Sequence, residues 1–154
     1  MSELTRIEIV VALQSSDLFA FCKAEEILRI AGIARQRRYA AGTRIYEQSG
    51  PAEMLYLVVH GEVALQGADG PAGTIERLQS FGVREILCGR LHDQDATASR
   101  ETLALAIESD DFFDLLANNI DIVKSLFRNL LQDGASSTGA GSTGAGGTGG
   151  PAGA

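Results

Sequence analysis

The sequence is short of cysteine and of long apolar runs, and each shortage excludes a class of protein. Its 154 residues include only two cysteines, Cys22 and Cys88. They form no CxxC motif, so we expect reduced thiols rather than a disulfide framework. No stretch approaches the ~18 consecutive apolar residues of a membrane-spanning helix. The first residues lack the basic region and cleavage pattern of a signal peptide. Together these absences predict a cytoplasmic protein.

Basic residues are also scarce, with 13 Lys and Arg against 20 Asp and Glu and a formal net charge of −7 at pH 7. An acidic surface repels phosphate backbones, which argues against nucleic-acid binding by the chain as a whole. One local cluster of positive charge stands out, made of Arg35, Arg37, Arg38 and Arg44. We interpret this cluster as the solvated face of a strand.

Half of the 18 glycines fall within residues 134–154, a segment with no charged or aromatic side chain. Such a segment cannot bury enough apolar surface to offset the entropy lost on ordering it. The sequence therefore predicts a folded domain over residues 1–133. It predicts a disordered Gly/Ser/Thr/Ala-rich tail over residues 134–154.

Apolar periodicity predicts helices at both ends of the domain and strands between them. Helical patterns cover residues 4–13, 23–31, 109–116 and 120–132. Between the two pairs, short apolar runs broken by glycine turn signals predict seven or eight strands, the clearest at 43–46, 54–59, 62–66, 74–79, 96–100 and 102–107. Residues 54–59 are apolar throughout, so we expect this strand to be buried on both faces. The order favours an α+β fold, an antiparallel, jelly-roll-like β roll with N-terminal and C-terminal helices.

These motifs, taken in order, resemble the cyclic nucleotide-binding domain family of catabolite-activator-type regulators, cyclic-nucleotide-dependent kinases and gated channels. The resemblance covers most of residues 15–132. Its main parts are the first helices (17–19 and 24–27), a turn and strand (41–46), a strand–Gly–strand unit (55–63) and the helix after the roll (111–116). One departure is Ser49-Gly50, where the family usually has Gly-Asp. The resemblance implies a ligand-sensing domain rather than an enzyme.

In this family the ligand lies in a cassette that starts with Gly-Glu, whose Glu accepts a hydrogen bond from the ribose 2′-hydroxyl. The cassette ends with an Arg that pairs with the cyclic phosphate, followed by Ser/Thr-Ala-Thr. Here it starts at Phe81-Gly82 and ends at Ala96-Thr97, which places Gln94 at the Arg position. We prefer a register with Glu85 at the Glu position; in the other register Val83 replaces the Glu and two extra residues lie later. The resemblance implies these ligand-binding residues: Gly82, Arg84, Glu85, Ile86, Leu87, Cys88, Gln94, Ala96 and Thr97.

The replacement of Arg by Gln94 predicts weak or absent cyclic nucleotide binding. A hydrogen bond to a charged group is worth ~1.5–3 kcal/mol, and every ~1.4 kcal/mol changes affinity tenfold. Gln94 donates a hydrogen bond but carries no charge, and Asp93 and Asp95 add negative charge nearby. Either Arg84 or Arg90 could supply the missing guanidinium instead.

Other chemistry has little support in the sequence. His60 and His92 have no Cys or His partner at metal-ligand spacing, so we interpret them as surface or hydrogen-bonded histidines. His92 with Asp93 and Asp95 is the one cluster that could hold a metal, and we interpret it as a solvated loop instead. The glycine-containing segment 67–73 reads as a hairpin loop and lacks the pattern of a phosphate-cradling loop. No serine lies in a nucleophile elbow. We therefore expect no catalytic activity, no cofactor and no metal.

Two functions remain open at this point. The first is a non-enzymatic regulatory module that senses a cyclic nucleotide or a related small ligand weakly and relays the signal through its C-terminal helices. The second is a protein-interaction or scaffold module that keeps the fold and has lost the ligand. Residues 120–132 either cap the roll or form a surface for self-association or a protein partner. Residues 134–154 do not read as a helix-turn-helix, so we expect no DNA-reading module.

Overall fold

The computed structural model describes residues 3–142. Two short helices come first in the chain. Helix α1 (Arg6–Gln14) has Thr5 as its N-cap. The Thr5 side chain accepts a hydrogen bond from the Glu8 backbone N–H (3.2 Å), and the Glu8 carboxylate accepts one from the Thr5 N–H (2.7 Å). Helix α2 (Ala24–Ile33) follows. Both helices confirm the N-terminal helical segments predicted from the sequence.

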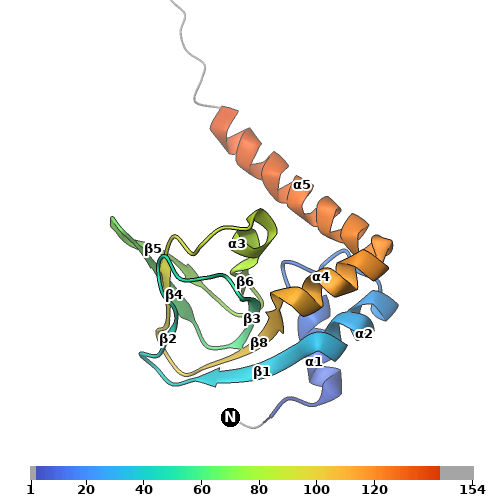
Figure 1. The fold of residues 1–154 in the computed structure, drawn as a ribbon, viewed down its shortest axis with the longest axis horizontal. Helices are drawn as coiled ribbons and strands as arrows, with labels where there is room; N and C mark the ends of the chain where they lie inside the picture. Colours follow the sequence, from blue (N-terminus) through green and yellow to red (C-terminus); the bar gives the residue numbers. More distant parts are fainter. Residues whose placement is uncertain (1–2, 143–154) are drawn as a thin grey trace, which may run out of the picture.

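Within the described residues, eight strands form two four-stranded antiparallel sheets that curve into a roll (Figure 1). One sheet has the order β1-β8-β3-β6 and the other β2-β7-β4-β5. The strands are β1 (Ala34–Tyr39), β2 (Arg44–Tyr46), β3 (Met54–His60), β4 (Val63–Gly67), β5 (Gly70–Ile75), β6 (Ser80–Phe81), β7 (Asp95–Ala98) and β8 (Thr102–Glu108). The predicted α+β β roll is therefore confirmed.

Two details of the strands bear on the sequence predictions. Strand β1 exposes Arg35, Arg37 and Arg38, which confirms the solvated strand face. The segment interpreted as a hairpin loop is shorter than predicted, because Gly67 and Gly70 are cross-strand partners and β5 starts at Gly70. Gly70 and Gly73, which indicated a turn in the sequence, lie in strand β5 because they pair with β4.

Strand β3 separates two apolar cores. Leu55, Leu57 and Val59 pack in the cluster formed with the helices. Tyr56 and Val58 belong to a second cluster inside the roll. Successive strand side chains point to opposite faces, so a continuous apolar run suits a strand covered on both sides. The prediction that this segment is buried on both faces is confirmed.

The C-terminal helices pack next to α2 at one end of the roll, and Figure 1 shows α5 rising away from it. Helix α4 spans Ser109–Asn118 and helix α5 spans Ile120–Ser142. The structure thus corrects the predicted helix end before Gly134. The division into a domain over residues 1–133 and a disordered tail over residues 134–154 stays a prediction. Extending an existing helix avoids the cost of nucleation, which lets it continue through small residues. Residues 143–154 of the predicted tail lie outside the described residues.

The two cysteines are free in the structure, Cys22 partly buried and Cys88 exposed. Burial raises the pKa of the Cys22 thiol to about 11, with Glu26 contributing. The thiol is therefore protonated near neutral pH and a poor nucleophile. Within residues 3–142, no helix combines the length and the apolarity needed to cross a bilayer.

Candidate functional site

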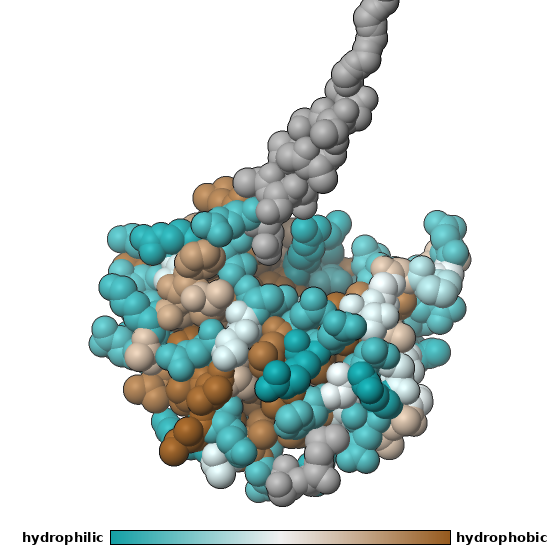
Figure 2. Space-filling view, turned by 180° about the vertical axis from the view of Figure 1, so that it is seen from behind, coloured by the Kyte–Doolittle hydropathy of each residue, from teal (hydrophilic) through white to brown (hydrophobic). Residues whose placement is uncertain are grey.

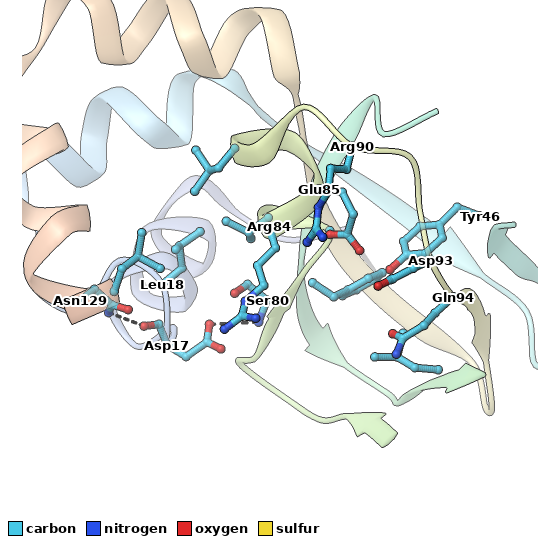
Figure 3. Close-up of a pocket in the computed structure, with 16 residues that line it drawn as sticks. Asp17, Leu18, Tyr46, Ser80, Arg84, Glu85, Arg90, Asp93, Gln94 and Asn129 are labelled. Atoms are coloured by element: carbon cyan, nitrogen blue, oxygen red, sulfur yellow. Dashed lines mark hydrogen bonds between the residues drawn. The ribbon is translucent and has the colours of Figure 1, made fainter. Parts of the chain in front are cut away.

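A pocket of about 390 Å³ opens where the roll, helix α3 (Val83–Cys88) and helix α5 come together (Figure 3). Its walls come from seven parts of the chain: the loop after α1, strands β2, β4 and β6, helix α3, the loop before β7, and helix α5. The lining residues are Asp17, Leu18, Tyr46, Leu65, Ser80, Phe81, Gly82, Val83, Arg84, Glu85, Leu87, Arg90, Asp93, Gln94, Asn129 and Leu130. The pocket is therefore a tertiary feature built around the predicted cassette.

Gly82 sets the start of α3. Its φ of +80° lies in the left-handed region, and a Cβ there would come 3.0 Å from the Met54 carbonyl oxygen. Helix α3 begins at Val83 directly after it. This leaves no loop for extra residues between Gly82 and the helix. Whether Glu85 or Val83 stands at the family's Glu position stays a prediction.

Five of the nine predicted ligand-binding residues line the pocket: Gly82, Arg84, Glu85, Leu87 and Gln94. The other four do not. Ile86 is 5% exposed and packs in the helical core, whereas Cys88 is exposed. Ala96 is fully buried inside the roll and Thr97 lies on β7 next to it. Since neighbouring residues on a helix or strand point in different directions, a run of sequence cannot face one pocket throughout.

Both arginines that could replace the missing guanidinium line the pocket. Figure 3 shows Arg84 extending toward Asp17 and Arg90 lying beside Glu85. Asp93 is the third acidic side chain in the lining. Two guanidinium groups thus face three carboxylates, a formal balance that stays negative.

Asp95 lies outside the pocket, whereas Asp93, two residues earlier, lines it. The Asp95 carboxylate accepts a hydrogen bond from the Gln48 backbone N–H (2.7 Å) and lies 4.0 Å from the Arg44 guanidinium. It is absent from the pocket lining. Of the two acids expected to add charge to the site, only Asp93 reaches it.

Several lining residues carry no sequence signal for this role. The Asp17 carboxylate accepts a hydrogen bond from the Ser80 N–H (3.0 Å), and the Asp17 carbonyl accepts one from the Asn129 side chain. Asn129 and Leu130 therefore bring α5 into the pocket wall. Tyr46 reaches it from β2. Only the tertiary fold brings residues so distant in sequence together.

His92 corrects the interpretation of its segment as a solvated loop. Its side chain is only 3% exposed, and its ring stacks on Tyr46 with 3.5 Å between centroids and an interplanar angle of 4°. Its Nδ1 lies 3.7 Å from Glu85 Oε1. Burial, with a smaller contribution from Glu85, raises the pKa of the Tyr46 phenol, which stays neutral. Packing against Tyr46 offsets the loss of solvent around the ring.

The segment with His92, Asp93 and Asp95 was also the one considered as a metal site. Within the residues that the structure describes, no three His, Cys, Asp or Glu side chains come together in a way that could hold an ion. His60 is exposed at the end of β3.

Comparisons with known proteins agree with this architecture. A family model described as the cyclic nucleotide-binding domain matches residues 36–119, more than half of the chain. Among solved structures, the N-terminal domain of a transcriptional regulator from Streptomyces coelicolor A3(2) has a TM-score of 0.74 at 20% identity, over 84% of this chain and 96% of that one. A proposed cyclic nucleotide-binding protein from Ruegeria pomeroyi has a TM-score of 0.76 at 19% identity, over 94% and 66%.

A third similar structure is the regulatory subunit of a cAMP-independent protein kinase A from Trypanosoma brucei. Its TM-score is 0.67 at 20% identity, over 77% of this chain and 46% of that one. The chain thus spans only part of some structures that it matches, and these identities establish the fold alone. The comparison with curated proteins found no match. From the family match and the shared fold together, the chain belongs to the cyclic nucleotide-binding domain family.

Proposed function

We propose that the chain is a non-enzymatic, cytoplasmic regulatory module that binds a cyclic nucleotide or a related small ligand weakly and relays binding through α5. The observation that carries this proposal is the make-up of the pocket, where two guanidinium groups meet three carboxylates on a ligand-binding fold. The ligand would contact Gly82, Arg84, Glu85, Leu87 and Gln94. Ile86, Cys88, Ala96 and Thr97 would support those residues without touching it.

The weakness of binding follows from charge. A cyclic phosphate is an anion, and Arg84 and Arg90 favour it electrostatically. Asp17, Glu85 and Asp93 oppose it from the same walls. The uncharged Gln94 amide adds no compensating charge. The expected result is an affinity well below that of a pocket with an unopposed arginine.

The relay follows from the position of α5. Asn129 and Leu130 form part of the pocket wall, and the Asn129 side chain donates its hydrogen bond to the Asp17 carbonyl. A ligand that displaces either group changes the contact between α5 and the loop after α1. Because α5 continues beyond the roll, a small change at the pocket moves its far end further.

The test is calorimetric titration of the whole chain with cAMP and with cGMP. We expect weak binding by the natural protein and about tenfold tighter binding by Gln94→Arg, since a charged hydrogen bond is worth ~1.5–3 kcal/mol. Gln66→Arg, at the exposed position of β4 and outside the pocket lining, is the matched control for added charge. If neither the natural protein nor Gln94→Arg produces heat at millimolar nucleotide, the cyclic nucleotide part of the proposal is wrong.

The alternative, a protein-interaction module, is favoured by the outer face of α5. Ile120, Phe127 and Leu131 are 63%, 60% and 71% exposed. They lie seven and then four residues apart, which places them along one side of the helix. Figure 2 shows hydrophobic surface beside the point where the grey segment begins. We propose a second copy of this chain as the partner, since an apolar stripe on a projecting helix is suited to pairing with itself.

Self-association is tested by sedimentation equilibrium. We expect the natural chain to dimerise and Phe127→Glu to shift it to monomer. Leu28→Glu, at a 49%-exposed apolar position on α2, is the matched control and should leave the dimer intact. A natural chain that stays monomeric at high concentration would rule out the second copy as partner.

A further inference from the structure

His92 is anchored at the back of the pocket wall by its own backbone. Its N–H donates a hydrogen bond to the Gly50 carbonyl (3.0 Å), and its carbonyl accepts one from the Ser49 N–H (2.6 Å). Both partners belong to the turn after β2, where Ser49 has a φ of +68°. The loop before β7 is therefore held at the His92 backbone, and the ring itself is held by its stacking on Tyr46.

The His92 ring lies between an aromatic ring and a carboxylate. One face stacks on Tyr46, and Nδ1 points toward Glu85 Oε1 at 3.7 Å. Among the described residues Nδ1 has no hydrogen-bond partner, although it is buried. A buried polar nitrogen without a partner is rare in folded proteins. The ring is thus placed next to an acid without yet bonding to it.

Glu85 connects this buried ring to the ligand site. Its side chain is 13% exposed and lines the pocket. A neutral imidazole at this distance leaves the carboxylate available to the pocket, whereas an imidazolium attracts it and cancels its charge. The other titratable group in contact with the ring is Tyr46 of β2, whose phenol stays neutral. Asp93 and Arg90 of the same loop line the pocket.

We propose that His92 positions Glu85 and that protonation of the His92 ring withdraws the Glu85 charge from the pocket, so that ligand binding depends on pH. This inference rests on the proposed ligand-binding function of the same pocket. Imidazole is the side chain that ordinarily changes charge between pH 5 and 8. An anionic ligand therefore binds more tightly on the acidic side of this range, where the ring offsets the carboxylate.

The first measurement needs no ligand. Imidazole NMR signals of the whole chain are followed between pH 5 and 8, with the exposed His60 as internal reference. In Glu85→Gln we expect His92 to bind its proton less tightly than in the natural chain, because the opposite charge is gone. Glu62→Gln, which removes the carboxylate paired with Arg100 (3.7 Å), is the matched control and should leave His92 unchanged. Identical His92 titrations in Glu85→Gln and the natural chain would overturn the proposal.

The second measurement uses cAMP as the probe at pH 5.5 and pH 8. We expect several-fold tighter binding at pH 5.5 in the natural chain and no difference in His92→Phe, which keeps an aromatic ring against Tyr46. A pH dependence that persists in His92→Phe would also overturn the proposal. Absence of cAMP binding at both pH values counts against the proposed function instead. In that case the imidazole titration alone tests whether His92 is coupled to Glu85.

Discussion

Strand β3 and the cassette from Gly82 to Gln94 differ in what holds their residues in place. In β3, five consecutive side chains from Leu55 to Val59 are no more than 8% exposed, and they alternate between the helical core and the roll interior. In the cassette, exposed, half-buried and buried residues alternate without a period. Hydrophobic burial dictates which way each β3 residue faces. The cassette is oriented by one glycine, a few backbone bonds and a stacked ring, so its geometry depends on contacts with other parts of the chain.

The largest effect is expected in β3. Leu57→Ala removes a side chain that is 2% exposed and should lower the free energy of unfolding by about 2–5 kcal/mol, through lost burial and the cavity left behind. Urea denaturation followed by circular dichroism measures the change. Leu91→Ala, at a 60%-exposed position in the loop before β7, is the matched control and should cost less than ~0.5 kcal/mol. Equal losses would contradict the assignment of Leu57 to the buried core.

A smaller loss of stability is expected at the start of the cassette. Gly82→Ala places a methyl group 3.0 Å from the Met54 carbonyl in a left-handed conformation, which should cost about 1–3 kcal/mol. Gly89→Ala has a similar φ of +64° but meets nothing within 4 Å, so about 1 kcal/mol is expected there. Thermal unfolding compares the two variants. If Gly82→Ala loses no more than Gly89→Ala, the approach to Met54 does not constrain α3.

The smallest effect concerns charge in the pocket and changes binding rather than stability. Asp93→Asn removes one of the three lining carboxylates and should raise cAMP affinity a few-fold at low salt, with less effect at high salt. Asp95→Asn serves as the comparison, since its carboxylate bonds to the Gln48 N–H outside the lining. Titration calorimetry at two ionic strengths measures both. A larger gain in Asp95→Asn than in Asp93→Asn would contradict the assignment of Asp93 to the site.

Sequence patterns predicted the fold well wherever burial produces a period. The alternation at 62–66, the unbroken apolar run at 54–59 and the helical pattern at 23–31 all correspond to elements of the structure. Predictions were poorer where small or polar residues dominate. The end of α5 and the extent of the 67–73 hairpin depend on helix continuation and strand pairing, which composition does not encode.

The candidate site was predictable only in part. Gly82, Glu85 and Gln94 were identified from their place in the cassette and do line the pocket, whereas Asp17, Tyr46 and Asn129 had no local signal. His92 was interpreted as part of a solvated loop because a polar segment with two acids is usually hydrated. Its burial results from stacking on Tyr46, a residue of another strand.

The amino-acid order alone determined that this chain builds a β roll between two pairs of helices, because alternating and helical apolar patterns leave few other ways to remove those side chains from water. Folding in three dimensions decided which charges share the pocket. Electrostatic interactions act through space, and the distances from Arg84, Arg90 and Asp93 to one another and to Asp17 exist only once α3, the loop before β7 and the loop after α1 have packed together.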